Sequence, residues 1–354
     1  SGNRLRISGQ LVDTQTDFPL WSERYDREMK DVFEVQDEIA RKIAEALRIT
    51  LSPQEKEGIG VKPTQNLQAY DLYLRGKSFA RRRTRQDLEF ALQMFESAVS
   101  LDPNFALAHA AVANACAQYH LHFQREAAWI ERAKSACQRA AALQPQLPEV
   151  MVAQAWLHYA EQKFDDAIGS AQQAIERKRD SEGAYYILGR ALFSAGRYQE
   201  AAGIAEAAIE ASGDDYNIYV PIQNALGALG KEEALRNFRL QRIQALEQHL
   251  KQVPEDARAR SHLAISYATT GRPEDAIREI NLAVALRPDD ALLLYNAACI
   301  FCLMKKKPEA MEALRKAWHA GYKDASWARR DPDLALLHDE PEFDKLYPPS
   351  PPAD

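Results

Sequence analysis

Small and apolar residues recur with a period of 34 in the second half of the chain. Across residues 256–290 they form two amphipathic stripes, separated by a glycine and closed by a proline. The stripes return in the segment that follows, where Ala276 and Ala283 have counterparts 34 residues later in Ala310 and Ala317. Apolar spacings of three and four residues are typical of helices, so each period predicts a pair of packed helices.

Glycine and proline stand where such a helix pair needs them. Gly271 can adopt a positive φ at the end of the first helix, and Pro273 suits the first turn of the second, where a missing N–H loses no bond. Ala264 and Ala276 are small where neighbouring backbones approach each other. These residues and their spacing resemble the tetratricopeptide repeat (TPR), a helix–turn–helix unit of 34 residues.

The resemblance implies a mainly α fold, a TPR-type α-solenoid of about seven helix hairpins over residues 64–322. The expected hairpins cover residues 68–101, 105–145, 148–180, 182–215, 216–254, 256–288 and 290–322. The second is longer than the repeat, and residues 120–127 are expected to form an extended turn. Residues 323–347 should form short helices that cover the last repeat, since an open solenoid end exposes apolar surface. Residues 348–354 are expected to fray.

A different pattern occupies residues 1–60. Apolar and polar residues alternate over 3–13 and again over 20–25, which predicts a β-hairpin. A helix is expected over 31–51, with Asp31 as its N-cap and Glu34 as the capping-box partner. A lone hairpin is marginally stable in water. We therefore expect its strands to join a larger sheet or to pair with a second copy of the chain.

Two stretches of this region, LWSERYDR at 20–27 and DVFEVQDEIA at 31–40, resemble the closing part of the TolB-type (FlgO-like) amino-terminal domain. WARRDPDLALLHDEPEF at 327–343 resembles the usual ending of such proteins. The resemblance implies that residues 1–60 are the remnant of a truncated α/β domain. It also implies a bacterial signalling protein in which a nucleotide cyclase, protein kinase or winged-helix regulator precedes this module, often with a membrane helix between.

Net charge and hydropathy narrow the classes of partner. The formal charge is −6 and the pI is near 5.8, which argues against nucleic-acid binding by this fragment. The one basic run, Arg81 to Arg85, is interpreted as a solvated interhelical turn, with phosphate binding as the alternative.

The longest apolar run, 291–304, is shorter than the roughly 20 residues a bilayer span needs, so no membrane insertion is expected. The start at Ser1 without Met favours an excised fragment. Bacterial cytoplasm and periplasm both stay open.

No constellation of catalytic residues is found, and neither an enzyme nor a cofactor is expected. The sequence has no G-x-S-x-G, no phosphate-binding loop and no H-E-x-x-H. Cys299 and Cys302 form a C-x2-C pair inside a helical pattern, where core packing is the simpler role. His120 and His122 are a weak candidate metal pair. Paired aspartates at the repeat turns, such as those at 289 and 290, are expected to cap helices.

The first helix of each hairpin lines the concave face in TPR proteins, and this rule predicts a partner-binding groove. Aromatic and arginine side chains dominate interface energetics, and amides can bind a peptide backbone. The predicted set is Tyr70, Tyr73, Lys77, Asn114, Gln118, Trp156, Tyr159, Tyr186, Arg190, Phe193 and Asn224.

The expected partner is a protein or peptide, and the alternative for each aromatic residue is packing between repeats. Tyr73 stands where a chaperone-binding carboxylate clamp would need Lys, which argues against a chaperone ligand. A second hypothesis makes this the sensory or dimerisation half of a cyclase, kinase or transcriptional regulator. In that case the hairpin and helix of residues 1–60 would form a homodimer.

Overall fold

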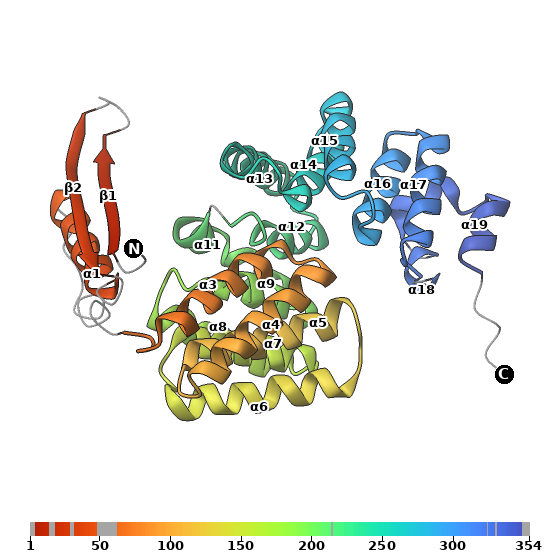
Figure 1. Ribbon diagram of the computed structural model, residues 1–354. Coiled ribbons are helices and arrows are strands. Elements are labelled where there is room, and N and C mark those ends of the chain that lie inside the picture. The colour runs from red at the N-terminus through yellow and green to blue at the C-terminus, as the bar shows by residue number, and fades with distance from the viewer. Residues whose placement is uncertain are drawn as a thin grey trace.

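Seven antiparallel helix pairs follow one another along the chain (Figure 1). The computed structural model describes residues 4–13, 18–28, 32–47, 62–213, 215–323, 325–329 and 331–348. The pairs are α3 (Leu67–Arg82) with α4 (Arg85–Leu101), α5 (Ala106–His122) with α6 (Ala127–Leu143), α7 (Pro148–Ala160) with α8 (Phe164–Arg177), α9 (Ala184–Ser194) with α10 (Tyr198–Gly203) and α11 (Ala205–Ser212), α12 (Tyr219–Ala228) with α13 (Glu232–Gln252), α14 (Ala257–Thr269) with α15 (Pro273–Leu286), and α16 (Ala291–Leu303) with α17 (Lys307–His319). The expected mainly α solenoid of seven hairpins is confirmed.

Alanine and glycine set the spacing of the helices. Ala264, Ala276 and Ala283 are completely buried, and Gly271 has φ 81° in the turn between α14 and α15. A Cβ added at Gly76 of α3 would lie 2.4 Å from the ring of Phe95 on α4. Larger residues at these contacts would therefore force the helices apart.

Two hairpins depart from the expected pattern. In the fourth, the second helix is interrupted at Ile204, so that α10 and α11 stand in place of one helix. Gly203 directly precedes the break, and glycine weakens a helix because it loses the most backbone freedom on folding. In the second hairpin α5 continues through His122, so only residues 123–126 lie between the helices. The extended turn expected over 120–127 is therefore shorter than predicted.

The amino-terminal region forms a two-stranded antiparallel sheet, β1 (Arg4–Val12) with β2 (Pro19–Glu28), and a helix, α1 (Val32–Ala46). Tyr25 and Val35 are buried between them. The second strand is longer than the expected 20–25. The proposed cap Asp31, the linker over 48–61 and the tail over 349–354 lie outside the described residues.

Three short helices follow the last hairpin. They are α18 (Ala325–Ala328), the 3₁₀ helix η2 (Pro332–Leu337) and α19 (Pro341–Leu346). Leu334, Leu337 and Phe343 are completely buried in the same apolar cluster as α16 and α17. The hydroxyl of Tyr295 on α16 donates to Asp331 Oδ2 at 2.6 Å. Apolar surface at this end of the solenoid is thus covered.

The solenoid curls until distant hairpins touch. Lys77 Nζ on α3 lies 2.6 Å from Glu182 Oε2, just before α9. Arg287, at the end of α15, lies 3.3 Å from the buried carboxylate of Asp87 on α4, 200 residues away in the chain. None of the helices in the described part of the chain has the length and apolar character needed to cross a bilayer.

Candidate functional site

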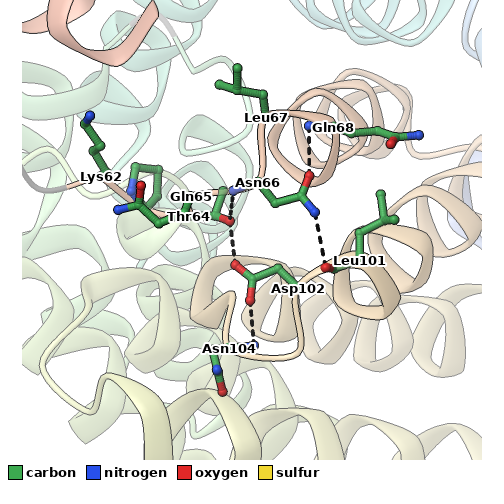
Figure 2. Close-up of a pocket in the computed structure, with 10 residues that line it drawn as sticks. Lys62, Thr64, Gln65, Asn66, Leu67, Gln68, Leu101, Asp102 and Asn104 are labelled. Atoms are coloured by element: carbon green, nitrogen blue, oxygen red, sulfur yellow. Dashed lines mark hydrogen bonds between the residues drawn. The ribbon is translucent and has the colours of Figure 1, made fainter. Parts of the chain in front are cut away.

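A shallow pocket lies where the solenoid begins, but its polar groups already have partners (Figure 2). Asn66 Oδ1 accepts from the backbone N–H of Gln68 and so caps α3. The Asn66 side-chain amide donates to the carbonyl of Leu101. Thr64 donates to Asp102, whose other oxygen accepts from the N–H of Asn104. These bonds join the start of α3 to the end of α4, so the polar groups that make them have a structural role.

Four residues of the predicted groove meet between α7 and α9. The Arg190 guanidinium carbon lies 5.8, 5.1 and 5.6 Å from the rings of Trp156, Tyr159 and Tyr186. Arg190 Nη1 donates to the Tyr186 hydroxyl at 3.0 Å, and Tyr159 bonds to Ser194 at 3.0 Å. Trp156 is only 2% exposed. Its ring supports the cluster from within, while Tyr159 and Arg190 reach partway to solvent.

The residues predicted on the first helix divide between core and surface. Tyr73 is buried, with its ring centroid 5.2 Å from that of Phe105. Tyr70 is half-buried and stacks on Tyr73 with a centroid separation of 6.4 Å. Lys77 forms the ion pair with Glu182. Tyr73 therefore packs between repeats, which was the alternative to a place in the groove.

The other predicted residues are dispersed. Gln118 donates to Asn114 Oδ1 at 2.5 Å on α5, and Gln118 Oε1 is buried with no hydrogen-bond partner among the described residues. Phe193 packs on Tyr198 with centroids 5.2 Å apart. Asn224 on α12 is exposed. The set is thus one compact cluster at α7 and α9 plus separate residues on α3, α5, α9 and α12.

Arg83 corrects the interpretation of the basic run. Arg81, Arg82 and Arg85 are exposed, as a solvated turn requires. Arg83 ends α3 with φ 53° in the left-handed region, and its guanidinium carbon lies 4.7 Å from the ring centroid of Tyr186. Asn and Gly are the usual residues in this conformation. The left-handed backbone directs Arg83 away from the solvated side of the run and onto the fourth hairpin.

Further basic residues from α13 and α14, absent from the predicted groove, lie near Arg83. Arg242 is 4% exposed, and its Nη2 lies 2.8 Å from His262 Nδ1. Arg258 lies over the ring of Tyr216 at 5.9 Å, and the rings of Tyr216 and His262 are 5.6 Å apart. Their convergence depends on the curvature of the solenoid, so local periodicity gives no signal for it.

The titration of nearby groups reflects this concentration of positive charge. Burial alone would raise the pKa of the Tyr186 phenol, but Arg83, Arg190 and Arg258 together lower it to about 8. Burial lowers the pKa of His262 well below its ordinary value, and Arg242, Arg258 and Arg83 lower it further. Near neutral pH, neutral imidazole is therefore favoured at this position.

His122 on α5 responds to the same positive charge. Its ring is exposed to solvent. Loss of hydration nevertheless lowers the pKa of His122 to about 3, with Arg190, Arg83 and Arg258 contributing.

The remaining candidates for chemistry have structural surroundings. Burial raises the pKa of the Cys116 thiol to about 12 and that of Cys137 to about 11, so neither is an activated thiolate. Asp290 caps α16 by accepting from the N–H of Leu293 at 2.9 Å, as expected of the turn aspartates. Within the described segments, no three His, Cys, Asp or Glu residues come together as metal ligands would.

Comparison with known proteins identifies the repeats. The sequence profile described as "Tetratricopeptide repeat" matches residues 152–216 and 243–291, and the chain carries such repeats. Over 112 residues the chain is 37% identical to "Putative adenylate cyclase 3" of Rhizobium meliloti, covering 32% of this chain and 19% of that protein. The chain therefore spans about a fifth of the length of this relative.

Solved structures include further tetratricopeptide repeat proteins. One from Parabacteroides merdae has a TM-score of 0.43 and 15% identity, covering 77% of this chain and 99% of that one. Another, from Thermus thermophilus, has a TM-score of 0.43 and 20% identity, covering 54% of this chain and 98% of that one.

Proposed function

We propose that the chain is the TPR arm of a bacterial signalling protein, a non-catalytic scaffold that holds a peptide or protein segment along its first helices. The observation that carries this proposal is a pair of unsatisfied groups on two predicted residues. Gln118 Oε1 and Arg190 Nε are buried without a hydrogen-bond partner among the described residues. One accepts and the other donates, which is what the N–H and C=O groups of an extended segment require.

The signalling context rests on sequence similarity. The stretch that matches a putative adenylate cyclase is the strongest support, and the TolB-like sequence at 20–40 agrees with it. A scaffold with this role would act through the partner it recruits and would leave chemistry to a domain elsewhere in the protein.

A peptide-display selection on the full chain tests the binding role. Enriched peptides are measured by fluorescence anisotropy against the chain and two variants. The double variant Gln118→Ala/Asn224→Ala should bind about tenfold more weakly, because it loses hydrogen bonds to the peptide backbone. Gln172→Ala, an exposed glutamine on α8, is the matched control and should bind normally. Equal affinity of all three proteins would contradict the proposal.

A second role, dimerisation through the amino-terminal hairpin, is favoured by its exposed apolar side chains. Phe18 is 72% exposed and Leu20 is 48% exposed, and both belong to or border a sheet of only two strands. Light scattering should give a dimer for the chain and a monomer for Phe18→Ser/Leu20→Ser. A chain that stays monomeric at high concentration would eliminate this role.

A further inference from the structure

Five arginines from four elements, α3, α9, α13 and α14, have buried guanidinium nitrogens that lack a hydrogen-bond partner among the described residues. We call them the arginine cluster: Arg83, Arg190, Arg239, Arg242 and Arg258, with the orphaned atoms Nη1, Nε, Nε, Nε and Nη1 in that order. Buried charged groups in proteins are nearly always paired. Five such atoms in one chain are therefore unusual.

Contacts and electrostatic influence connect the cluster. Arg83 and Arg190 both lie against the ring of Tyr186, at 4.7 and 5.6 Å. Burial lowers the pKa of Arg242 to about 10, and Arg258 lowers it further than any other charged group. Burial and then Arg258 also lower the pKa of Arg83. Arg258 therefore acts electrostatically on both Arg83 of α3 and Arg242 of α13.

Two nearby carboxylates do not neutralise the cluster. Asp215 already accepts from the side chain of Asn217 at 2.6 Å. Asp256 accepts from the backbone of Ala259 and lies 2.9 Å from His249 Nε2. Counting these groups alone, the five guanidinium charges exceed the two carboxylate charges by three. Because like charges repel strongly where water is scarce, a bound anion would lower the electrostatic energy of the cluster.

We propose that the arginine cluster is a binding site for a multiply charged oxyanion, either a phosphate group or a set of carboxylates carried by a ligand. Guanidinium groups present planar pairs of N–H donors that match both oxyanions. His122, which is exposed to solvent, lies within the electrostatic influence of Arg190, Arg83 and Arg258. The proposal extends the proposed function, on which its peptide form rests, because it names the charge of the ligand.

Isothermal titration of the full chain with inorganic pyrophosphate, at constant ionic strength in chloride, tests the site. The chain should bind, and Arg258→Gln should bind about tenfold more weakly because one charge-assisted interaction is lost. Arg75→Gln removes the same charge from a 66% exposed side chain of α3 and should bind as the unaltered chain does. Circular dichroism verifies the fold, and Arg239→Gln replaces Arg258→Gln if that variant unfolds.

A second titration, with hexaglutamate, separates the two sources of the anion. Binding of pyrophosphate alone assigns a phosphorylated ligand, and binding of hexaglutamate assigns an acidic segment; both support the site. If neither anion binds, or if Arg258→Gln and Arg75→Gln bind equally, the site is overturned. Peptides selected by display could still bind in that event, so the proposed function would survive the loss of this inference.

Discussion

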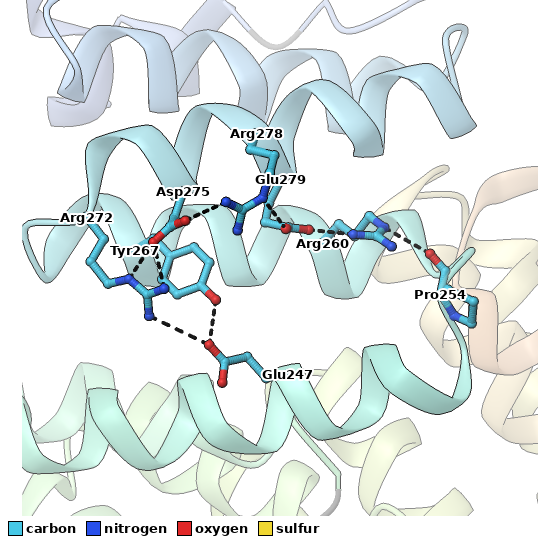
Figure 3. Close-up of polar contacts among 8 residues, drawn as sticks. All are labelled: Glu247, Pro254, Arg260, Tyr267, Arg272, Asp275, Arg278 and Glu279. Atoms are coloured by element: carbon cyan, nitrogen blue, oxygen red, sulfur yellow. Dashed lines mark hydrogen bonds and ion pairs between the residues drawn. The ribbon is translucent and has the colours of Figure 1, made fainter.

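Arginine has opposite surroundings in two regions of the solenoid. Between α13 and α15 a paired network links Arg260, Arg272 and Arg278 to three carboxylates (Figure 3). Its remaining members are Glu247, Pro254, Tyr267, Asp275 and Glu279. Glu279 accepts from Arg260 at 2.5 Å and from Arg278 at 3.3 Å, and Asp275 accepts from Arg272 and Arg278, each at 2.6 Å.

The arginine cluster has no such balance. In the paired network three guanidinium groups meet three carboxylates, and only Glu279 is buried among the carboxylates. In the cluster, five guanidinium groups lie beside two carboxylates that other groups already occupy. The paired arginines thus hold neighbouring helices together, whereas the cluster arginines carry positive charge that the neighbouring described carboxylates do not balance.

The largest effect is expected from breaking the paired network at its buried carboxylate. Glu279→Gln leaves the guanidinium of Arg260, 16% exposed, without its counter-charge. Breaking a buried ion pair costs about 3 kcal/mol of unfolding free energy, which urea denaturation followed by circular dichroism measures. Glu312→Gln, whose carboxylate is half exposed on α17, should cost less than about 1 kcal/mol. Equal losses would remove the contrast.

Two tyrosines report the contrast through their pKa values. Arg83, Arg190 and Arg258 lower the pKa of Tyr186 to about 8 against burial, whereas burial and the hydrogen bond to Glu247 raise the pKa of Tyr267. The tyrosinate absorbance should therefore show one ionisation near pH 8 that Tyr186→Phe removes and Tyr267→Phe retains.

The lowered pKa of Tyr186 also makes the stability of the fold depend on pH. An unfolded tyrosine has a pKa of about 10, so the depressed folded value stabilises the protein fully above pH 10. That contribution disappears as the pH falls from 10 through 8. If Tyr186→Phe leaves the ionisation in place, the positive charge around this ring is not as described.

Acid should lower the free energy of unfolding through His262. Its pKa is lowered in the folded protein, by burial first and then by Arg242, Arg258 and Arg83. Below about pH 6.5 this imidazole binds a proton in the unfolded chain but not in the folded chain, so the free energy of unfolding decreases as the pH falls. In His262→Gln the loss should be smaller by up to about 1.4 kcal/mol per pH unit. The exposed His319→Gln should follow the unaltered chain, and an identical loss in both variants would contradict this explanation.

The smallest effect is expected from Arg258→Gln in a buffer without phosphate. This variant loses the contact with Tyr216, about 0.5–1 kcal/mol, and gains relief from repulsion by Arg83 and Arg242. These two effects oppose each other, so the free energy of unfolding, measured by thermal denaturation, should change by less than about 1 kcal/mol. A loss as large as that of Glu279→Gln would show that Arg258 has a structural partner.

Local sequence was enough to predict the hairpins, because their signals repeat within each unit. The alanines at 276, 283, 310 and 317 are all buried at helix contacts, and Gly271 has the expected positive φ. The break at Ile204 was missed, since Ala201 and Ala208 keep the helical spacing on both sides of it. Alternation at the amino terminus likewise predicted β1 and β2.

The candidate site was predicted only in part. The TPR resemblance placed Trp156, Tyr159, Tyr186 and Arg190 on two consecutive first helices, and these four side chains do meet. The other cluster arginines come from the first, fifth and sixth hairpins. Their proximity is set by the accumulated rotation from one repeat to the next, and no short-range pattern encodes that rotation.

The ion pair between Asp87 and Arg287 closes the curve of the solenoid. In an open solenoid each unit responds only to its neighbours, but here the first and sixth hairpins share an ion pair. An extended segment could enter while this ion pair is intact, whereas a folded partner would require the ion pair to break. We expect the rate at which the ion pair opens to govern the entry of such a partner.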